Sequence, residues 1–307
     1  MTNEIIFHHY STSPFSEKVR LAFGIKGLEW RSVEIPNMMP KPDLLPLTGG
    51  YRKTPVMQIG ADIFCDTQII LRELERRFPT PSLFPNGKGL PYGLAFWTDR
   101  LFFMPTVGVV FGEIGDMIPE AFKEDRAKMS GTAFSTDAMK AAAPFARDQY
   151  RANAAFLESQ LADGRTFMWG DSATAADIHC HMNIWFAKSF VPQAADPLLK
   201  EFPKVEAWYA RMNAIGHGKR KEMDSKEAIA IAKAAQSDAK PAVDPFDPRG
   251  LKPGDKVKVS ADDYGRDAVA GEIVFSNAHE IAIRRHDDQV GDVVVHFPRA
   301  GFVVVPD

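Results

Sequence analysis

The spacing of apolar residues changes twice along the 307-residue chain, and this change limits the folds it can adopt. Up to about residue 82, short apolar runs alternate with amphipathic segments, which predicts strands alternating with helices. From about residue 90 to 216, apolar residues recur at three- and four-residue intervals, as in helices that bury one face. After residue 250, about five short runs rich in Val and Ile predict strands. We therefore expect an α/β domain, an all-α bundle and a small all-β domain of SH3-like size.

The first part has the order strand, helix, strand, loop, hairpin, helix. Its strands are predicted at 5–7 and 30–35, and its hairpin at 55–66, turning at Gly60 and Ala61. One helix begins at Ser13 and Pro14, and a second is predicted at 67–77. This order fits a small sheet with helices packed against it.

The domain boundaries follow from the same pattern. We predict an N-terminal domain at 1–82, a helical domain at 88–218 and a β domain at 249–307. The segment between the last two, 219–248, combines an Ala-rich helix with a Pro-rich linker.

Composition excludes a broad attraction to polyanions. The chain has 37 basic and 40 acidic residues, a net charge of -3, and the tail from Pro241 onward is itself more acidic than basic. A surface that follows nucleic-acid phosphates or an acidic membrane would be basic, so we expect neither partner. We also expect a cytoplasmic protein, because Cys65 and Cys180 lie in apolar stretches and no apolar run approaches membrane-spanning length.

No metal site is expected from the histidines. His179 and His181 are two residues apart on a predicted helix, so their side chains diverge, and we expect them to pack in the core. His279, His286 and His296 show no ligand spacing and are expected on solvated loops.

Ser13 stands at a helix start and is followed by proline. A serine there is an ordinary cap, because its side-chain oxygen accepts a hydrogen bond from a free backbone N–H and proline suits the first helical position. On its own the pair indicates only a helix start.

Four segments together resemble the glutathione transferase superfamily, whose N-terminal domain is thioredoxin-like and whose C-terminal domain is all helical. They are "SPFSEKVRLAF" at 13–23, "KTPVMQIG" at 53–60, "DTQII" at 66–70 and "GDSATAADIHCH" at 170–181. In the last segment, Thr174 and Asp177 have the spacing of a capping box, a structural role. The resemblance covers about residues 4–216 and implies glutathione as co-substrate.

The resemblance assigns roles to five residues. It implies that Ser13 faces the glutathione sulfur and that Pro55 is the family's cis-proline. It implies that the backbone of Thr54 pairs with the cysteinyl part of glutathione, and that Asp66 and Thr67 hold the γ-glutamyl end. A helix N-terminus at this end would favour a carboxylate.

Two features depart from the family's pattern. The loop before the proline, "LPLTGGYRKTP", has two glycines and the basic residues Arg52 and Lys53. Lys53 could meet the glycyl carboxylate of glutathione or remain a solvated charge. The β-rich tail lies outside the usual two-domain architecture, and we expect it to support packing, oligomers or protein interactions.

Ser13 would need to supply only a modest stabilisation of the thiolate to ionise a bound thiol near neutral pH. A thiol with a pKa of about 8.5 needs a drop of roughly two units, about 2.7 kcal/mol, to ionise near neutral pH. A charge-assisted hydrogen bond offers roughly 1.5 to 3 kcal/mol, and a helix N-terminus about 0.3 to 1 more. Tyr10, at the end of the first strand, is the rival donor, although the spacing to the helix favours Ser13.

The leading hypothesis is a glutathione transferase-like enzyme in which the thiolate attacks an electrophilic carbon, or which catalyses a glutathione-dependent reduction or isomerisation. The family usually forms homodimers. A pocket for a small hydrophobic electrophile is predicted from Phe15, Trp97, Phe102, Phe103, Met104 and Phe111.

The alternative is a non-catalytic binding or scaffold protein of the same fold, whose C-terminal β domain mediates protein interaction. Thiol–disulfide exchange is disfavoured, because Ser13 and Ser16 stand where a redox motif needs cysteine.

Overall fold

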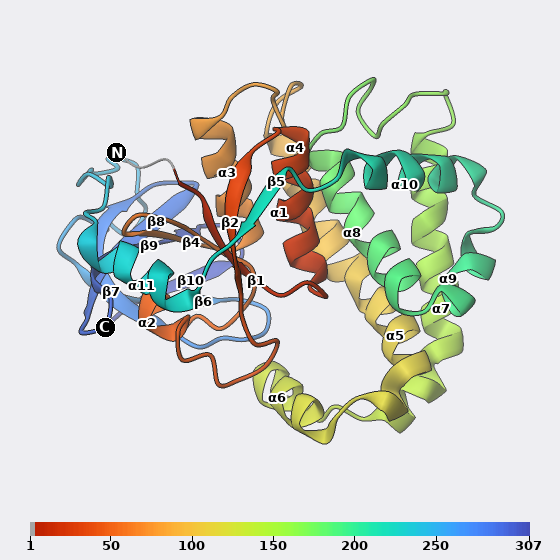
Figure 1. Ribbon diagram of the computed structural model, residues 1–307, viewed down its shortest axis with the longest axis horizontal. Helices are drawn as coiled ribbons and strands as arrows, with labels where there is room; N and C mark the ends of the chain where they lie inside the picture. Colours follow the sequence, from red (N-terminus) through yellow and green to blue (C-terminus); the bar gives the residue numbers. More distant parts are fainter. Residues whose placement is uncertain (1–3) are drawn as a thin grey trace.

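The computed structural model describes residues 4–307, and Figure 1 shows a β-rich part on one side and a helical part on the other. The N-terminal elements are the strands β1 (Ile6–His9), β2 (Glu29–Glu34), β3 (Val56–Ile59) and β4 (Asp62–Cys65) and the helices α1 (Pro14–Ile25), α2 (Leu45–Thr48) and α3 (Thr67–Arg77). The predicted order of strand, helix, strand, hairpin and helix is confirmed, with α2 as a short addition.

The helical part begins with one nearly continuous helical stretch. It comprises α4 (Gly89–Phe96), the π-helical turn η1 (Trp97–Phe102), α5 (Phe103–Ile114) and the 3-10 turn η2 (Gly115–Met117). The remaining helices are α6 (Glu120–Ser130), α7 (Thr136–Gln160), α8 (Ala175–Phe190), α9 (Pro192–Leu199) and α10 (Pro203–Ile215). The predicted helical bundle is therefore confirmed.

The stretch Gly89–Met117 is long and apolar enough to cross a membrane by length and composition alone, so the expectation that no run approaches that length is wrong. In the structure, α5 packs against α7 and α8 as one helix of the bundle. The apolar residues of this stretch therefore contribute to packing within the helical part, although several of its side chains are exposed.

The C-terminal part contains the five predicted strands, β6 (Lys256–Ala261), β7 (Val269–Ser276), β8 (Glu280–Asp287), β9 (Gly291–Pro298) and β10 (Phe302–Pro306). The fold is therefore a thioredoxin-like domain, a helical domain and a β-rich C-terminal region, as predicted. The closure of these strands into an SH3-like barrel stays a prediction, as do the domain boundaries.

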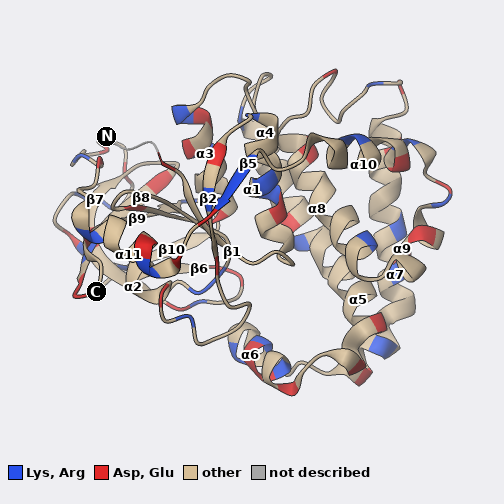
Figure 2. Cartoon of the chain, viewed as in Figure 1, with Lys and Arg blue, Asp and Glu red and all other residues tan. Residues whose placement is uncertain are grey.

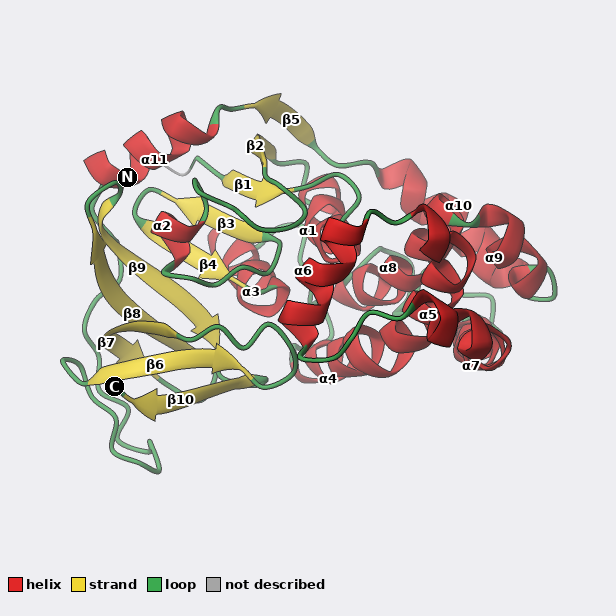
Figure 3. Cartoon of the chain, turned by 90° about the horizontal axis from the view of Figure 1, so that it is seen from below, coloured by secondary structure: helices red, strands yellow, loops and turns green. Residues whose placement is uncertain are grey.

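One sheet runs through the molecule in the order β10-β6-β7-β8-β9-β4-β3-β1-β2-β5. The C-terminal strands join the N-terminal ones where β9 pairs with β4 in parallel, with Val295 beside Ile63. Figure 3 shows this continuation from β4 to β10. The edge of β4, which would otherwise offer unpaired backbone groups, is therefore covered by the chain's own C-terminal region.

At the other end of the sheet, β5 (Lys219–Glu222) pairs in parallel with β2. The sequence pattern missed this strand because its residues, Lys-Arg-Lys-Glu, are all exposed and lack apolar alternation. Figure 2 shows it as a basic ribbon. Helix α11 (Ser225–Ala234), which follows, was predicted, and it packs near β9 and β2.

The alternation of side chains along each strand creates two cores. Phe7 and Met57 face the helical part and join a core with α1, α3 and α8. Ile6 and Val56, one residue earlier, face the other way and join a core with α11 and the C-terminal strands. Because successive strand residues point to opposite faces, the same N-terminal strands pack against the helical part on one face and against α11 and the C-terminal strands on the other.

Helix α8 begins with the predicted capping box. The Asp177 carboxylate accepts hydrogen bonds from the backbone N–H and the hydroxyl of Thr174, both at 2.9 Å. It also accepts one from the indole N–H of Trp208 on α10, at 2.9 Å. This buried carboxylate therefore fixes both the start of α8 and its packing against α10.

The histidines differ partly from expectation. His179 and His181 are buried in the core as predicted, and residues 4–307 contain no cluster that could hold a metal ion. Of the three expected on solvated loops, His279 is exposed in the loop before β8, His286 is exposed but lies on strand β8, and His296 lies on β9 and is 5 % exposed. The missed signal is its place inside the continuous, buried apolar run "VVVHF".

Candidate functional site

Ser13 is the N-cap of α1, and its Oγ accepts a hydrogen bond from the backbone N–H of Ser16 at 3.1 Å. The backbone N–H of Ser13 donates to the carbonyl of Tyr10 at 3.0 Å, which closes the turn between β1 and α1. The guanidinium of Arg20 donates to the Ser11 carbonyl at 3.0 Å and pairs with Glu17 at 2.7 Å. The turn that carries Ser13 is therefore held from within α1.

Tyr10, the alternative hydrogen-bond donor to the thiolate, lies beside Ser13. Burial raises the pKa of Tyr10 above its ordinary value, against a hydrogen bond with Ser13 and the positive charge of Arg126. The ammonium of Lys41 lies 5.8 Å from the centre of the Tyr10 ring. At neutral pH the Tyr10 phenol is protonated and available as a donor.

Lys41 is a candidate that the sequence reasoning missed. Its ammonium donates to the carbonyl of Arg52 at 2.9 Å and to the hydroxyl of Thr54 at 3.0 Å. Burial, with the nearby charges of Arg126 and Arg52, lowers the pKa of Lys41 to about 8. Within residues 4–307 the hydrogen-bond acceptors of this ammonium are these two neutral oxygens, and Lys41 is 4 % exposed. The Thr54–Pro55 peptide bond is cis, as the family resemblance implies for Pro55.

Asp66 and Thr67 begin helix α3. Asp66 is the N-cap and accepts a hydrogen bond from the backbone N–H of Gln68 at 2.8 Å. Its φ of 95° lies in the left-handed region, which a side chain other than glycine rarely adopts and which is found at functional sites. Burial raises the pKa of Asp66 to about 6. Thr67 follows it and is buried.

An ion pair that the sequence analysis did not predict joins α1 to the helical part. The ammonium of Lys18 is 2.6 Å from the carboxylate of Asp99, which lies on the π-helical turn η1. Both groups interact electrostatically with Asp66. π-helical turns are frequent at functional sites, and Asp99 lies on this one.

Lys53 is engaged by the C-terminal region. Its ammonium lies 2.6 Å from the carboxylate of Asp263 and 4.4 Å from the centre of the Tyr264 ring. Tyr264 in turn interacts electrostatically with Tyr10 and Asp99, and Lys53 with Asp66. Side chains from the turn after β1, from the start of α3, from η1 and from the β6–β7 loop thus interact electrostatically with one another.

The predicted electrophile pocket is brought together only in part. Phe15 lies 5.0 Å from Phe103, and Phe103 and Phe111 lie 6.1 and 6.3 Å from Phe186 of α8, measured between ring centres. This aromatic cluster borders the start of α1. The structure does not bring the other three to the cluster: Phe102 is fully buried, Trp97 stacks on Phe102, and Met104 is 65 % exposed.

The reason is geometric. Successive residues on a helix point about 100° apart, so positions 102, 103 and 104 cannot share one pocket. Phe103 faces α8, Phe102 faces the core, and Met104 faces outward.

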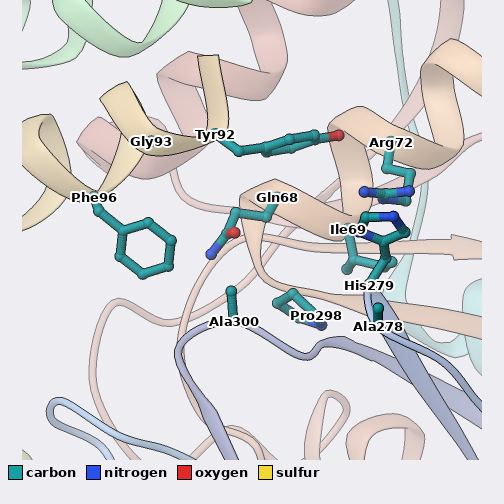
Figure 4. Close-up of a pocket in the computed structure, with 10 residues that line it drawn as sticks. All are labelled: Gln68, Ile69, Arg72, Tyr92, Gly93, Phe96, Ala278, His279, Pro298 and Ala300. Carbon is teal, nitrogen blue, oxygen red and sulfur yellow. The ribbon is translucent and has the colours of Figure 1, made fainter. Parts of the chain in front are cut away.

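A cavity of about 150 Å³ lies away from Ser13, between α3, α4 and the C-terminal strands. Figure 4 shows Arg72, Tyr92 and His279 around it. It contains none of the predicted site residues, and the electrostatic interactions described above place the candidate site elsewhere.

Family profiles match two parts of the chain. The profile described as the N-terminal domain of glutathione S-transferase matches residues 7–82. A second profile, described only as a domain of unknown function, matches residues 114–220.

A probable glutathione S-transferase of Solanum tuberosum is 32 % identical over 88 residues, a match that spans 28 % of this chain and 39 % of the potato protein. The crystal structure of rice GST1 in complex with glutathione superposes with a TM-score of 0.53 at 19 % identity, covering 74 % of this chain and 96 % of the rice chain. This second likeness concerns the fold alone.

The crystal structure of a GST-like protein from Pseudomonas syringae is 39 % identical, covers 100 % of both chains and superposes with a TM-score of 0.82. Its full coverage includes the β-rich C-terminal region, which is therefore shared between the two proteins. From this relative and from the N-terminal profile we conclude that the chain belongs to the glutathione S-transferase superfamily, with an additional C-terminal β region.

Proposed function

We propose that the protein binds glutathione in its N-terminal domain and stabilises the glutathione thiolate for attack on an electrophilic substrate. The observation that carries the proposal is the position of the Ser13 hydroxyl at the N-terminus of α1, within a turn shared with Tyr10. The helix N-terminus and the hydroxyl both favour negative charge on a sulfur placed there.

The polar groups around Ser13 match the two ends of glutathione. Asp66 and Thr67, at the start of α3, would hold the ammonium and carboxylate of the γ-glutamyl end. The backbone of Thr54 would pair with the cysteinyl part. At the glycyl end, Lys41 and Lys53 are the candidate cations: Lys41 has no carboxylate partner within residues 4–307, and Lys53 is paired with Asp263.

The chemical step is a nucleophilic displacement or addition. The thiol proton leaves to solvent, and the thiolate then supplies the electron pair of the new carbon–sulfur bond. In a displacement, the leaving group departs with the electron pair of its own bond to carbon. In an addition to an activated alkene, the π electrons move to the adjacent carbon, which takes a proton from solvent. Phe15, Phe103 and Phe111 offer an apolar surface for such an electrophile.

Titration calorimetry with glutathione tests binding, and turnover of a generic aryl halide tests catalysis. We expect Ser13→Ala to lower turnover by about 10- to 100-fold, the value of one charge-assisted hydrogen bond, with glutathione affinity nearly unchanged. Loss of the helix cap would also cost about 1 kcal/mol of stability.

Ser16→Ala is the matched control, because it removes another buried hydroxyl from the same turn. We expect it to retain turnover. Unchanged turnover in Ser13→Ala, with loss in Tyr10→Phe, would transfer the donor role to Tyr10.

The non-catalytic alternative has two specific observations in its favour: Ser13 is 1 % exposed, and Lys53 already has an internal partner. A scaffold of this fold would show no heat with millimolar glutathione and no turnover. That result would replace the enzyme proposal with a protein-interaction role for the C-terminal region.

We further propose that the protein acts in the cytoplasm as a homodimer. Support for the dimer comes from exposed apolar side chains on the packed helices α5 and α7 and the turn between α4 and α5, namely Leu101, Met104, Phe145 and Phe156. Side chains of this size are more stable when another surface covers them.

A further inference from the structure

The loop between β6 and β7, residues 262–268, reaches from the C-terminal region into the glutathione site proposed above. Its first residue, Asp262, donates its backbone N–H to the Gly301 carbonyl at 3.0 Å and pairs with Arg100 of η1. In its middle, the backbone N–H of Gly265 donates to the Met129 carbonyl on α6 at 2.8 Å. The loop is thus fixed to the C-terminal region and to the helical part.

Gly265 explains how the loop can pass so close to the site. Its φ is +59°, which favours glycine, and a Cβ there would lie 3.0 Å from the Met129 side chain and 3.1 Å from Cε of Lys53. The loop therefore runs directly between α6 and Lys53.

This path places two side chains of the loop on one cation. The Asp263 carboxylate is 2.6 Å from the Lys53 ammonium, and the Tyr264 ring lies 4.4 Å from it. The side chains of Lys53 and Asp263 are 12 % and 30 % exposed, so solvent screens this pair only in part. The neighbouring Lys41, in contrast, has only neutral oxygens as hydrogen-bond acceptors.

We propose that Asp263 is a specificity-determining residue, which competes with the glycyl carboxylate of glutathione for Lys53 and so disfavours thiols ionised at that end. This inference rests on the proposed function. A thiol whose glycyl carboxyl is esterified has no charge to place beside Asp263, and it leaves the Lys53–Asp263 pair intact. A free carboxylate must displace Asp263 or lie next to it, and like charges side by side oppose binding.

The test compares glutathione with its glycyl monoethyl ester by titration calorimetry on the full chain. We expect Asp263→Asn to raise the affinity for glutathione about tenfold and to leave the affinity for the ester within about twofold. The matched control is Asp267→Asn, which removes the same charge from an exposed position of the same loop. We expect this control to bind both thiols like the wild type.

Two results would overturn the inference. Equal gains for both thiols in Asp263→Asn would mean that the loop only obstructs the site, and unchanged binding of both would mean that Lys53 does not meet the glycyl end. In either case the proposed function stands, because glutathione still binds. Absence of binding by either thiol to every variant would overturn the proposed function and, with it, this inference.

Discussion

At the scale of the residue, the charged groups of the candidate site lie near two helix N-termini. Ser13 and Asp66 are both helix N-caps, and each presents a polar side chain at the positive end of its helix. Lys41, Lys53 and Lys18 surround them, and each has a different partner: neutral oxygens, a carboxylate of the C-terminal loop and Asp99. The site is therefore polar, partly closed and built from several distant segments of the chain.

Glutathione binding should depend on the ionisation of Asp66. Burial raises the pKa of Asp66 to about 6, so the carboxylate that would hold the γ-glutamyl ammonium is lost as the pH falls through that value. Between pH 7 and pH 5 its ionised fraction falls about tenfold, and calorimetry should show a similar loss of affinity. Asp66→Asn should bind weakly without this pH dependence.

Asp171→Asn serves as the control for this experiment, since Asp171 is exposed in the loop before α8. It should follow the wild-type pH profile. A flat wild-type profile between pH 7 and pH 5 would show that Asp66 does not carry the ammonium.

Sequence reasoning named Ser13, Thr54, Pro55, Asp66 and Thr67 as candidates because the short segments that contain them resemble the glutathione transferase superfamily. Lys53 was identified too, but its partner Asp263 lies 210 residues away, and no local pattern connects them. Lys18 and Lys41 are buried lysines, and composition predicts lysines at the surface.

At the scale of the element, the junction between β4 and β9 decides how the C-terminal region is attached. His296 of β9 pairs with Asp62 of β4 at 2.9 Å and with Glu280 of β8 at 2.7 Å, and it is 5 % exposed. Asp62 also accepts a hydrogen bond from the backbone N–H of Asp238, at 2.8 Å. One imidazolium and its two carboxylates thus join three strands and the segment that follows α11.

This junction predicts a loss of stability at alkaline pH. Burial lowers the pKa of His296, but the hydrogen bonds and charges of Asp62 and Glu280 outweigh it and raise the pKa to about 9. The folded value is above the ordinary 6.5, so the stabilisation is complete below pH 6.5 and is lost as the pH rises through 9. Urea unfolding should show up to about 3 kcal/mol less stability at pH 9.5 than at pH 6 from this group.

His296→Gln should be less stable at pH 6 and should lose this part of the alkaline pH dependence. His286→Gln removes an exposed histidine of β8 that pairs with Asp292, and it should behave like the wild type. Equal pH slopes in wild type and His296→Gln would exclude the junction as the cause.

The elements themselves were largely predictable, because apolar periodicity is a local property. The exceptions are instructive. Strand β5 has no apolar residue and exists because β2 offers it a free edge, so only the tertiary structure creates it. The pairing of β9 with β4 likewise joins segments that the sequence pattern assigns to separate domains.

At the scale of the whole molecule, the helical part and the C-terminal region both pack against the N-terminal strands of one sheet. The helical part covers one face of the N-terminal strands, and α11 with the C-terminal strands covers the other and extends the edge at β4. The side chains of Leu101 on η1, Met104 on α5, and Phe145 and Phe156 on α7 are left uncovered. These helices are therefore the place where a second copy would pack.

The proposed dimer should appear in light scattering as twice the chain mass of 34.1 kDa. We expect Met104→Glu, which places a charge on the exposed face of α5, to shift the protein to the single-chain mass. Val303→Glu is the control, because Val303 is an exposed apolar residue on β10, outside this face. A wild type of 34.1 kDa, or a dimer that both variants retain, would contradict the assignment of this surface.

The pairing of β9 with β4 also has a consequence during synthesis. Val295 cannot reach Ile63 until 232 further residues have been made, which takes roughly 10 to 50 s at 5 to 20 residues per second. During that interval the edge of β4 has no final partner, and the apolar face that carries Ile6, Val56 and Ile63 lacks the C-terminal strands that complete its core. Unpaired strand edges and exposed apolar faces pair readily with other chains, so the nascent N-terminal domain is most prone to aggregation during this interval.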